Sequence, residues 1–141
     1  MSSATQTPAV SKTQLWTGRI LSGLAVLFLL FDAVIKLIKI PPVIEAFVKL
    51  GYPPNLPIPI GIVLLVCVIS YVIPRTSVLG AILLTGYLGG AVATHVRVSD
   101  PLFSHVLFPT YVAALIWVGL YLREDRLRAL VPLRSPKTLS A

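Results

Sequence analysis

Apolar residues along the chain fall into four segments that are separated by short polar connections. These segments cover approximately residues 13–40, 58–73, 77–95 and 105–122. A helix that crosses a bilayer takes about 20 apolar residues, and only the second segment is short of that length. The second segment nevertheless contains no charged residue. We therefore predict an all-α integral membrane protein in which four transmembrane helices form an antiparallel bundle.

The connection between the first two segments has a helical pattern of its own. Glu45 and Lys49 lie four residues apart on one face, and the remaining positions of 43–50 are mostly apolar, which predicts a short amphipathic helix at the membrane surface. Pro41 and Pro42 precede it and are expected to end the first helix. Four prolines within residues 53–59 predict an extended return to the bilayer.

The two ends of the chain differ from this pattern in composition. Residues 1–12 consist largely of Ser, Thr, Ala and Pro without periodicity and predict a disordered N-terminal tail. Beyond residue 122 the sequence becomes charged, and it then has turn and coil composition. We therefore predict a membrane domain at 13–128 and a C-terminal tail at 129–141.

Composition supports a membrane protein and argues against a nucleic-acid partner. Hydrophobic residues make up 56% of the chain and charged residues 12%, and the mean hydropathy is +0.89. The net charge is +7, but the basic residues cluster beside apolar segments, which is typical of membrane topology and anionic lipid contact. The lipid bilayer is therefore the expected partner. The single cysteine, Cys67, excludes an internal disulfide and a CxxC redox motif.

The distribution of basic residues predicts the orientation. With four spans, both termini and the turn at 74–76 lie on one side of the membrane, and this side has the excess of Lys and Arg that marks the cytoplasmic face. Both termini are therefore expected in the cytoplasm. The basic residues on the cytoplasmic side are Lys12, Arg19, Arg75, Arg123, Arg126, Arg128, Arg134 and Lys137. Those on the opposite side are Lys39, Lys49 and Arg97.

Asp32 and Lys36 are the first candidates for function because they lie within the first apolar segment. Charged groups inside a membrane helix are costly and usually face a protein interior or a wet cavity. Their spacing of four residues favours an ion pair on one helical face. The alternative is purely structural: Lys36 extends to the interface and Asp32 is its partner.

Further polar residues are predicted at the same, outer end of the bundle. His95 ends the third segment, Arg97 and Asp100 follow it, and His105 begins the fourth. We expect an outward-opening pocket between the first, third and fourth transmembrane helices, with apolar walls and a few polar groups. The candidate catalytic residues are Asp32 and His95, and the candidate ligand-binding residues are Lys36, Tyr87, Arg97, Asp100 and His105.

Each of these residues has a simpler interpretation. Arg97 and Asp100 can form a loop ion pair, and Tyr87 can be ordinary packing. His95 and His105 can be interfacial residues or hydrogen-bond partners of Asp32. Two histidines with neither a third ligand nor i,i+4 spacing do not predict a metal or haem site.

Small residues recur every four positions in the third segment, at Gly86, Gly90 and Thr94. Such a ridge allows another helix backbone to approach closely, so we predict helix packing there.

Several motifs together resemble one family. They are Phe31-Asp32-x-x-x-Lys36-Leu37, the glycine-rich stretch 86–97 that ends in His95-Val96-Arg97, the segment 100–105 that ends in His105, and 117–123. These residues resemble the DoxX-like family of small bacterial membrane proteins. The resemblance implies a four-helix protein of the bacterial cytoplasmic membrane. The wider group includes the membrane subunit of a thiosulfate:quinone oxidoreductase and proteins linked to thiol redox balance, which implies a quinone or a partner redox subunit if the chain serves electron transfer.

Three functional hypotheses follow. The leading one is a membrane subunit or a protein that binds a small apolar, quinone-like ligand, with Asp32 and His95 bonding or exchanging protons with ligand oxygens. The second is a stand-alone membrane enzyme that uses the same two residues for proton transfer, as in an isomerisation. The third is a structural or assembly role through the ridge of small residues. The sequence leaves the choice between enzyme and binding protein open.

Overall fold

The computed structural model describes residues 10–131, and this part of the chain is helical, with no strand. The all-α prediction is confirmed. The elements are α1 (Lys12–Leu37), α2 (Pro41–Lys49), α3 (Pro57–Val72), α4 (Ser77–Arg97), the π-helical turn η1 (Leu102–Val106), α5 (Phe108–Arg123) and α6 (Asp125–Leu130).

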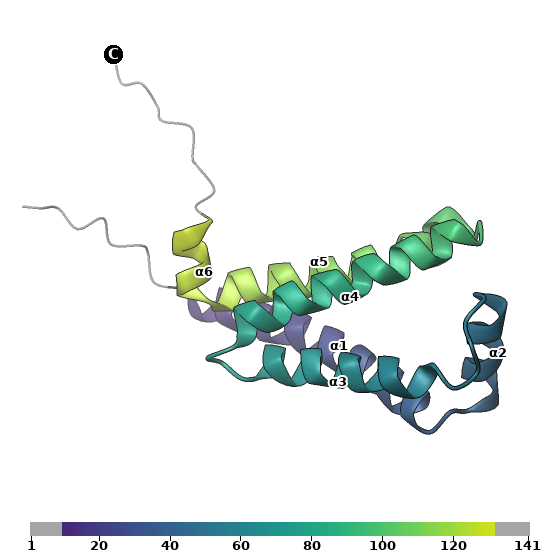
Figure 1. Ribbon diagram of the computed structural model, residues 1–141. Helices are drawn as coiled ribbons and strands as arrows, with labels where there is room; N and C mark the ends of the chain where they lie inside the picture. The colour runs from purple at the N-terminus through teal and green to yellow at the C-terminus, as the bar shows by residue number, and fades with distance from the viewer. Residues whose placement is uncertain (1–9, 132–141) are drawn as a thin grey trace, which may run out of the picture.

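The four longest helices form a ring in which each packs against two neighbours. α1 and α4 lie diagonally opposite, and both pack against α3 and α5. Figure 1 shows that the pair α1 and α3 meets the pair α4 and α5 near α6, and that the two pairs diverge toward α2. We call the end with α6 and the turn at 74–76 the closed end. The end with α2, residues 98–101 and η1 is the open end.

Glycines allow the helices to touch at the closed end. A Cβ atom at Gly119 of α5 would lie 2.5 Å from Ser22 Oγ and 2.8 Å from Ser22 N on α1. A Cβ atom at Gly18 would lie 2.7 Å from the Gly119 carbonyl oxygen. At the α3 to α4 turn, one at Gly80 would lie 2.2 Å from Tyr71 N. No side chain fits at these distances, so glycine is required for the helices to approach this closely.

The apolar core runs along the ring, and a second set of apolar side chains faces outward. Leu29, Leu64, Leu84 and Ile116 are almost fully buried. Large apolar residues are exposed on every ring helix, including Leu27, Phe31, Val66, Ile82 and Val118. An outer surface of this kind matches a lipid environment, since soluble monomers rarely expose large continuous apolar patches.

Three helical stretches are long and apolar enough to cross a membrane: Lys12–Leu37, Ser77–Arg97 and Leu102–Arg123. The last of these combines η1 with α5. α3 is equally apolar but has only 16 residues.

Helix boundaries differ from the sequence predictions at several places. The proline-rich return is not extended throughout, since residues 54–56 form a turn and Pro57 and Pro59 lie in the first turn of α3, where proline is tolerated. α1 ends at Leu37 and not at residue 40, since Lys39 adopts a φ of 51°, which a helix cannot contain. Pro41 and Pro42 occupy the first positions of α2, where proline is favoured, so they begin a helix as well as follow one. α5 begins at Phe108 and not at residue 105, because residues 102–106 form the separate turn η1.

No helix was predicted in the charged segment after residue 122, but residues 125–130 form α6. Asp125 lies in its first turn, where a negative charge is favourable, and Leu127 is buried against the bundle. Most of the predicted N-terminal tail and residues 132–141 of the predicted C-terminal tail lie outside the described residues.

Candidate functional site

A cavity of about 490 Å³ lies at the open end, within the size range of small-molecule sites. Its wall is built by α1, α3, α4 and α5 together with α2 and the segment that follows it. The lining residues are Phe28, Leu29, Asp32, Lys36, Phe47, Leu50, Tyr52, Ile60, Val63, Tyr87, Leu88, Gly90, Ala91, Thr94, His95, Phe108, Pro109 and Val112.

Most of this wall is apolar. Phe28 of α1 and Phe108 of α5 meet edge to face, with ring centroids 5.2 Å apart. Leu29, Leu88 and Val112 line the cavity and belong to the buried core. A wall of this composition suits the apolar body of a ligand, so the few polar groups in the lining determine how such a ligand would be oriented.

Asp32 and Lys36 form the ion pair that the sequence predicts, and both line the cavity. The Lys36 ammonium donates to Asp32 Oδ2. The Lys36 side chain is 12% exposed and that of Asp32 is 27% exposed. Lys36 therefore remains in the cavity wall, and its charge is balanced by the carboxylate one turn earlier on the same helix.

Tyr87 and His95 provide the polar groups of α4. They lie eight residues apart on one face, or roughly 12 Å along the helix axis, and both line the cavity. The hydroxyl of Tyr87 has no hydrogen-bond partner among residues 10–131, although its ring packs against the core.

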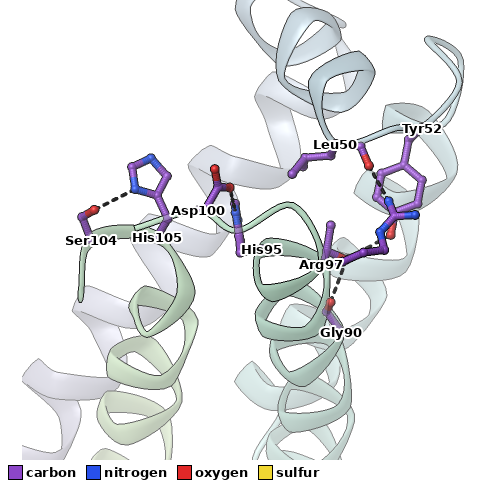
Figure 2. Close-up of polar contacts among 9 residues, drawn as sticks. Leu50, Tyr52, Gly90, His95, Arg97, Asp100, Ser104 and His105 are labelled. Atoms are coloured by element: carbon purple, nitrogen blue, oxygen red, sulfur yellow. Dashed lines mark hydrogen bonds and ion pairs between the residues drawn. The ribbon is translucent and has the colours of Figure 1, made fainter. Parts of the chain in front are cut away.

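His95 is held by the loop that follows α4. Its Nδ1 atom lies 2.6 Å from Asp100 Oδ2. Figure 2 shows the two side chains turned toward each other. The hydrogen bond from His95, supported by the positive charge of Lys49, holds the pKa of Asp100 below its ordinary value. Asp100 is therefore a carboxylate at neutral pH, and the pairing combines a side-chain bond with the backbone bond from Asp100 N to the His95 carbonyl at 3.1 Å.

Arg97 points to the opposite side of α4 and contacts the end of α2 (Figure 2). Its guanidinium donates to the Leu50 carbonyl and lies 5.5 Å from the centroid of the Tyr52 ring. The Tyr52 hydroxyl in turn lies 3.0 Å from Thr94 Oγ1. An ion pair between Arg97 and Asp100 does not form, because each side chain has another partner.

His105 lies beside His95, with ring centroids 6.0 Å apart. Its Nδ1 atom is 2.8 Å from Ser104 Oγ. Neither histidine bonds to Asp32. Of the predicted site residues, Asp32, Lys36, Tyr87 and His95 come together at the cavity. Arg97, Asp100 and His105 lie behind its rim and are not among the lining residues.

The ridge of small residues on α4 faces open space. A Cβ atom at Gly86 or Gly90 would meet nothing within 4 Å, so no helix of the described chain packs there. Gly90 lines the cavity instead. Thr94 bonds to Tyr52 and to the Gly90 carbonyl. Close packing on this ridge stays a prediction that concerns a partner outside the chain.

The contribution of α2 to the cavity was missed by the sequence prediction. Phe47 is buried and lines the cavity, and its ring centroid lies 6.0 Å from that of Tyr52. Phe47 lies on the apolar face of the predicted amphipathic helix. An apolar helix face of this kind fits contact with protein as well as contact with lipid. The aromatic residues Phe47 and Tyr52 were the sequence feature that could have indicated protein contact.

The helices and the cavity define an all-helical membrane protein. One end of its bundle contains an apolar pocket with a few polar groups in its lining. Residues 20–119 match the sequence model of the DoxX-like family, and the chain belongs to this family. No curated protein and no solved structure gave a significant match.

Proposed function

We propose that this protein spans the membrane four times and binds a small apolar molecule with at least one oxygen atom in the cavity at the open end. The observation that carries the proposal is the cavity itself. Its apolar walls enclose polar groups from α1 and α4, two helices that lie diagonally opposite in the ring. Quinones are one class of molecule with this chemistry, as the family resemblance implies.

The topology follows from the ring of helices. α3 packs between α1 and α4 in that ring, so it crosses the membrane together with these two helices. Its 16 residues extend about 24 Å, somewhat less than a typical hydrocarbon core. α2 then lies at the interface, with Val43 and Phe47 turned to the protein and Glu45 and Lys49 exposed. The membrane domain of this proposal is residues 13–128.

The orientation follows from the basic residues of the closed end, which include Arg75, Arg123 and Arg126. Their excess over the open end supports an orientation with the closed end and both termini in the cytoplasm. The cavity then lies in the outer half of the bacterial cytoplasmic membrane.

The roles of the lining residues follow from their position. His95 and Tyr87 offer polar atoms that have no described partner, and Asp32 offers a carboxylate paired with Lys36. These groups bond the oxygen atoms of the ligand or exchange protons with them. Behind the rim, Arg97 holds the end of α2, Asp100 holds His95, and His105 lies against the His95 ring.

The experiment that tests this function is native mass spectrometry of the full chain, purified gently from its own membrane, with identification of the bound molecules. Gly90→Leu is the blocking variant, since Gly90 lines the cavity and has space for a side chain. Gly89→Leu is its matched control, because Gly89 is equally open but does not line the cavity.

We expect a stoichiometric apolar molecule in the wild type and in Gly89→Leu, but not in Gly90→Leu. Asp32→Asn is expected to weaken its retention. Bulk phospholipid alone in all four proteins would refute the proposed function.

A further inference from the structure

The pair of His95 and Asp100 fixes the chemistry of one polar group in the cavity wall. His95 occupies the last turn of α4, and the chain turns back through Ser99, which has a φ of 56°. This turn brings Asp100 back to His95, where two hydrogen bonds form. The backbone N–H of Asp100 donates to the His95 carbonyl, and the Asp100 carboxylate bonds to the imidazole ring. The ring orientation of His95 is therefore determined by the loop and not only by the cavity.

The same pair determines which ring nitrogen carries the proton. The Asp100 carboxylate is ionised at neutral pH, and an ionised carboxylate can only accept hydrogen bonds. His95 must therefore donate from Nδ1. In the neutral imidazole the other nitrogen, Nε2, then carries a lone pair and is an acceptor.

Nε2 of His95 has no hydrogen-bond partner among the described residues, whereas most other polar groups of the cavity already have one. Asp32 is bonded to Lys36, and Thr94 is bonded to Tyr52 and to a carbonyl of its own helix. His95 lines the cavity, and an acceptor in an apolar wall is costly unless a donor reaches it. The ligand is the group that can supply this donor.

We propose that the ligand of the cavity carries a hydroxyl group that donates a hydrogen bond to His95 Nε2, and that Asp100 is the positioning residue that makes this nitrogen an acceptor. This inference rests on the proposed function and narrows it to apolar alcohols, phenols and enols. A ligand whose oxygen atoms can only accept, such as an ether, leaves the same nitrogen without a donor.

Three probes with one apolar body separate these alternatives: 1-naphthol, 1-methoxynaphthalene and naphthalene. Their affinities for the full-length protein in detergent are measured by equilibrium dialysis against empty micelles. Specific binding to the cavity is defined as the part that Gly90→Leu removes and Gly89→Leu retains.

In the wild type we expect 1-naphthol to bind about tenfold more tightly than the methyl ether, the effect of one hydrogen bond that is retained or lost. In His95→Phe and in Asp100→Asn this ratio is expected to fall to about twofold or less, while the affinity for naphthalene is retained. A purely structural role of Asp100 would lower all three affinities together. Arg75→Ala, at the turn of the closed end, is expected to keep the wild-type ratio.

The possible failures are distinguishable. If Gly90→Leu abolishes the binding of all three probes but the wild type shows no preference for the hydroxyl, the proposed function stands and this inference is overturned. The inference is likewise overturned if the preference is unchanged in both His95→Phe and Asp100→Asn. If no probe shows cavity-specific binding, the cavity is not an apolar ligand site and both proposals fall.

Discussion

Two tyrosines, one at the closed end and one in the wall of the cavity, show how differently the two ends are built. At the closed end, Tyr71 is 1% exposed, and its hydroxyl lies 2.8 Å from Ser22 Oγ and donates to the Ile116 carbonyl at 2.9 Å. Arg123 bonds to the same serine at 3.1 Å and lies over the Tyr71 ring. Tyr87 lines the cavity of the open end, and its hydroxyl has no described partner. Polar groups hold the helices together at one end and are available to a ligand at the other.

The glycines differ between the ends in the same way. Gly18 and Gly119 are enclosed by the facing helix, whereas Gly86, Gly89 and Gly90 face open space. A glycine in an apolar helix therefore has two roles in this chain: it allows close packing at the closed end, and it leaves the wall of α4 uncovered near the open end.

The largest effect is expected from adding one methyl group at the closed end. Gly119→Ala places a Cβ atom against the backbone of α1, which must move, and we expect a loss of about 3 kcal/mol in the free energy of unfolding. Gly89→Ala has open space and is expected to gain up to about 1 kcal/mol from reduced backbone freedom. Denaturation in mixed micelles measures both. Equal effects would show that the two ends do not differ in packing.

Removing one hydroxyl group from each tyrosine sharpens the comparison. Tyr71→Phe leaves the buried Ile116 carbonyl without its side-chain donor, and we expect a loss of about 2 kcal/mol in the free energy of unfolding. Tyr87→Phe removes a group with no described partner, so the free energy of unfolding is expected to change by less than about 0.5 kcal/mol. Ligand retention in native mass spectrometry is expected to show the reverse order. A larger loss of stability in Tyr87→Phe would contradict this assignment.

The fold was predictable to the extent that it depends on hydrophobic runs. The lengths and spacing of the apolar segments locate α1, α3, α4 and α5 within a few residues. The short helix α6 was not predictable, because six residues rich in charge form a helix only through burial of Leu127 against the bundle. Local propensity carries no information about that contact.

The site was predictable as a location but not as a set of contacts. Charged residues in apolar helices are rare, so Asp32 and Lys36 drew attention to one wall of the cavity, and the helix ends indicated His95. The bond between Asp100 and His95 depends on the backbone turn at Ser99. The bond between Arg97 and the Leu50 carbonyl depends on how far α2 folds back toward α4. Both are tertiary features that residue spacing does not determine. The network at Tyr71 was missed because an isolated tyrosine in an apolar segment gives no indication of its partner.

The pairing at the open end is expected to depend on pH in one direction. Because the pKa of Asp100 is lowered in the folded state, its contribution is complete above the ordinary value of 3.8 and is lost as the pH falls through the lower folded pKa. The melting temperature of the wild type should therefore exceed that of Asp100→Asn at pH 6, and the difference should shrink below pH 3.8. A difference that grows on acidification would show that Asp100 is not stabilised as a carboxylate.

Only a small effect on stability is expected where α2 is attached to α4. Arg97→Ala removes the contacts with the Leu50 carbonyl and the Tyr52 ring, which lie at the exposed rim, so the free energy of unfolding should fall by less than about 1 kcal/mol. Hydrogen exchange of residues 43–52 should nevertheless accelerate severalfold, because local opening needs only these contacts to break. Arg75→Ala, at the turn of the closed end, is the control and should leave that exchange unchanged. If exchange in α2 is the same in both variants, α2 is held by its buried residues Val43 and Phe47, and the open end is more rigid than its polar contacts indicate.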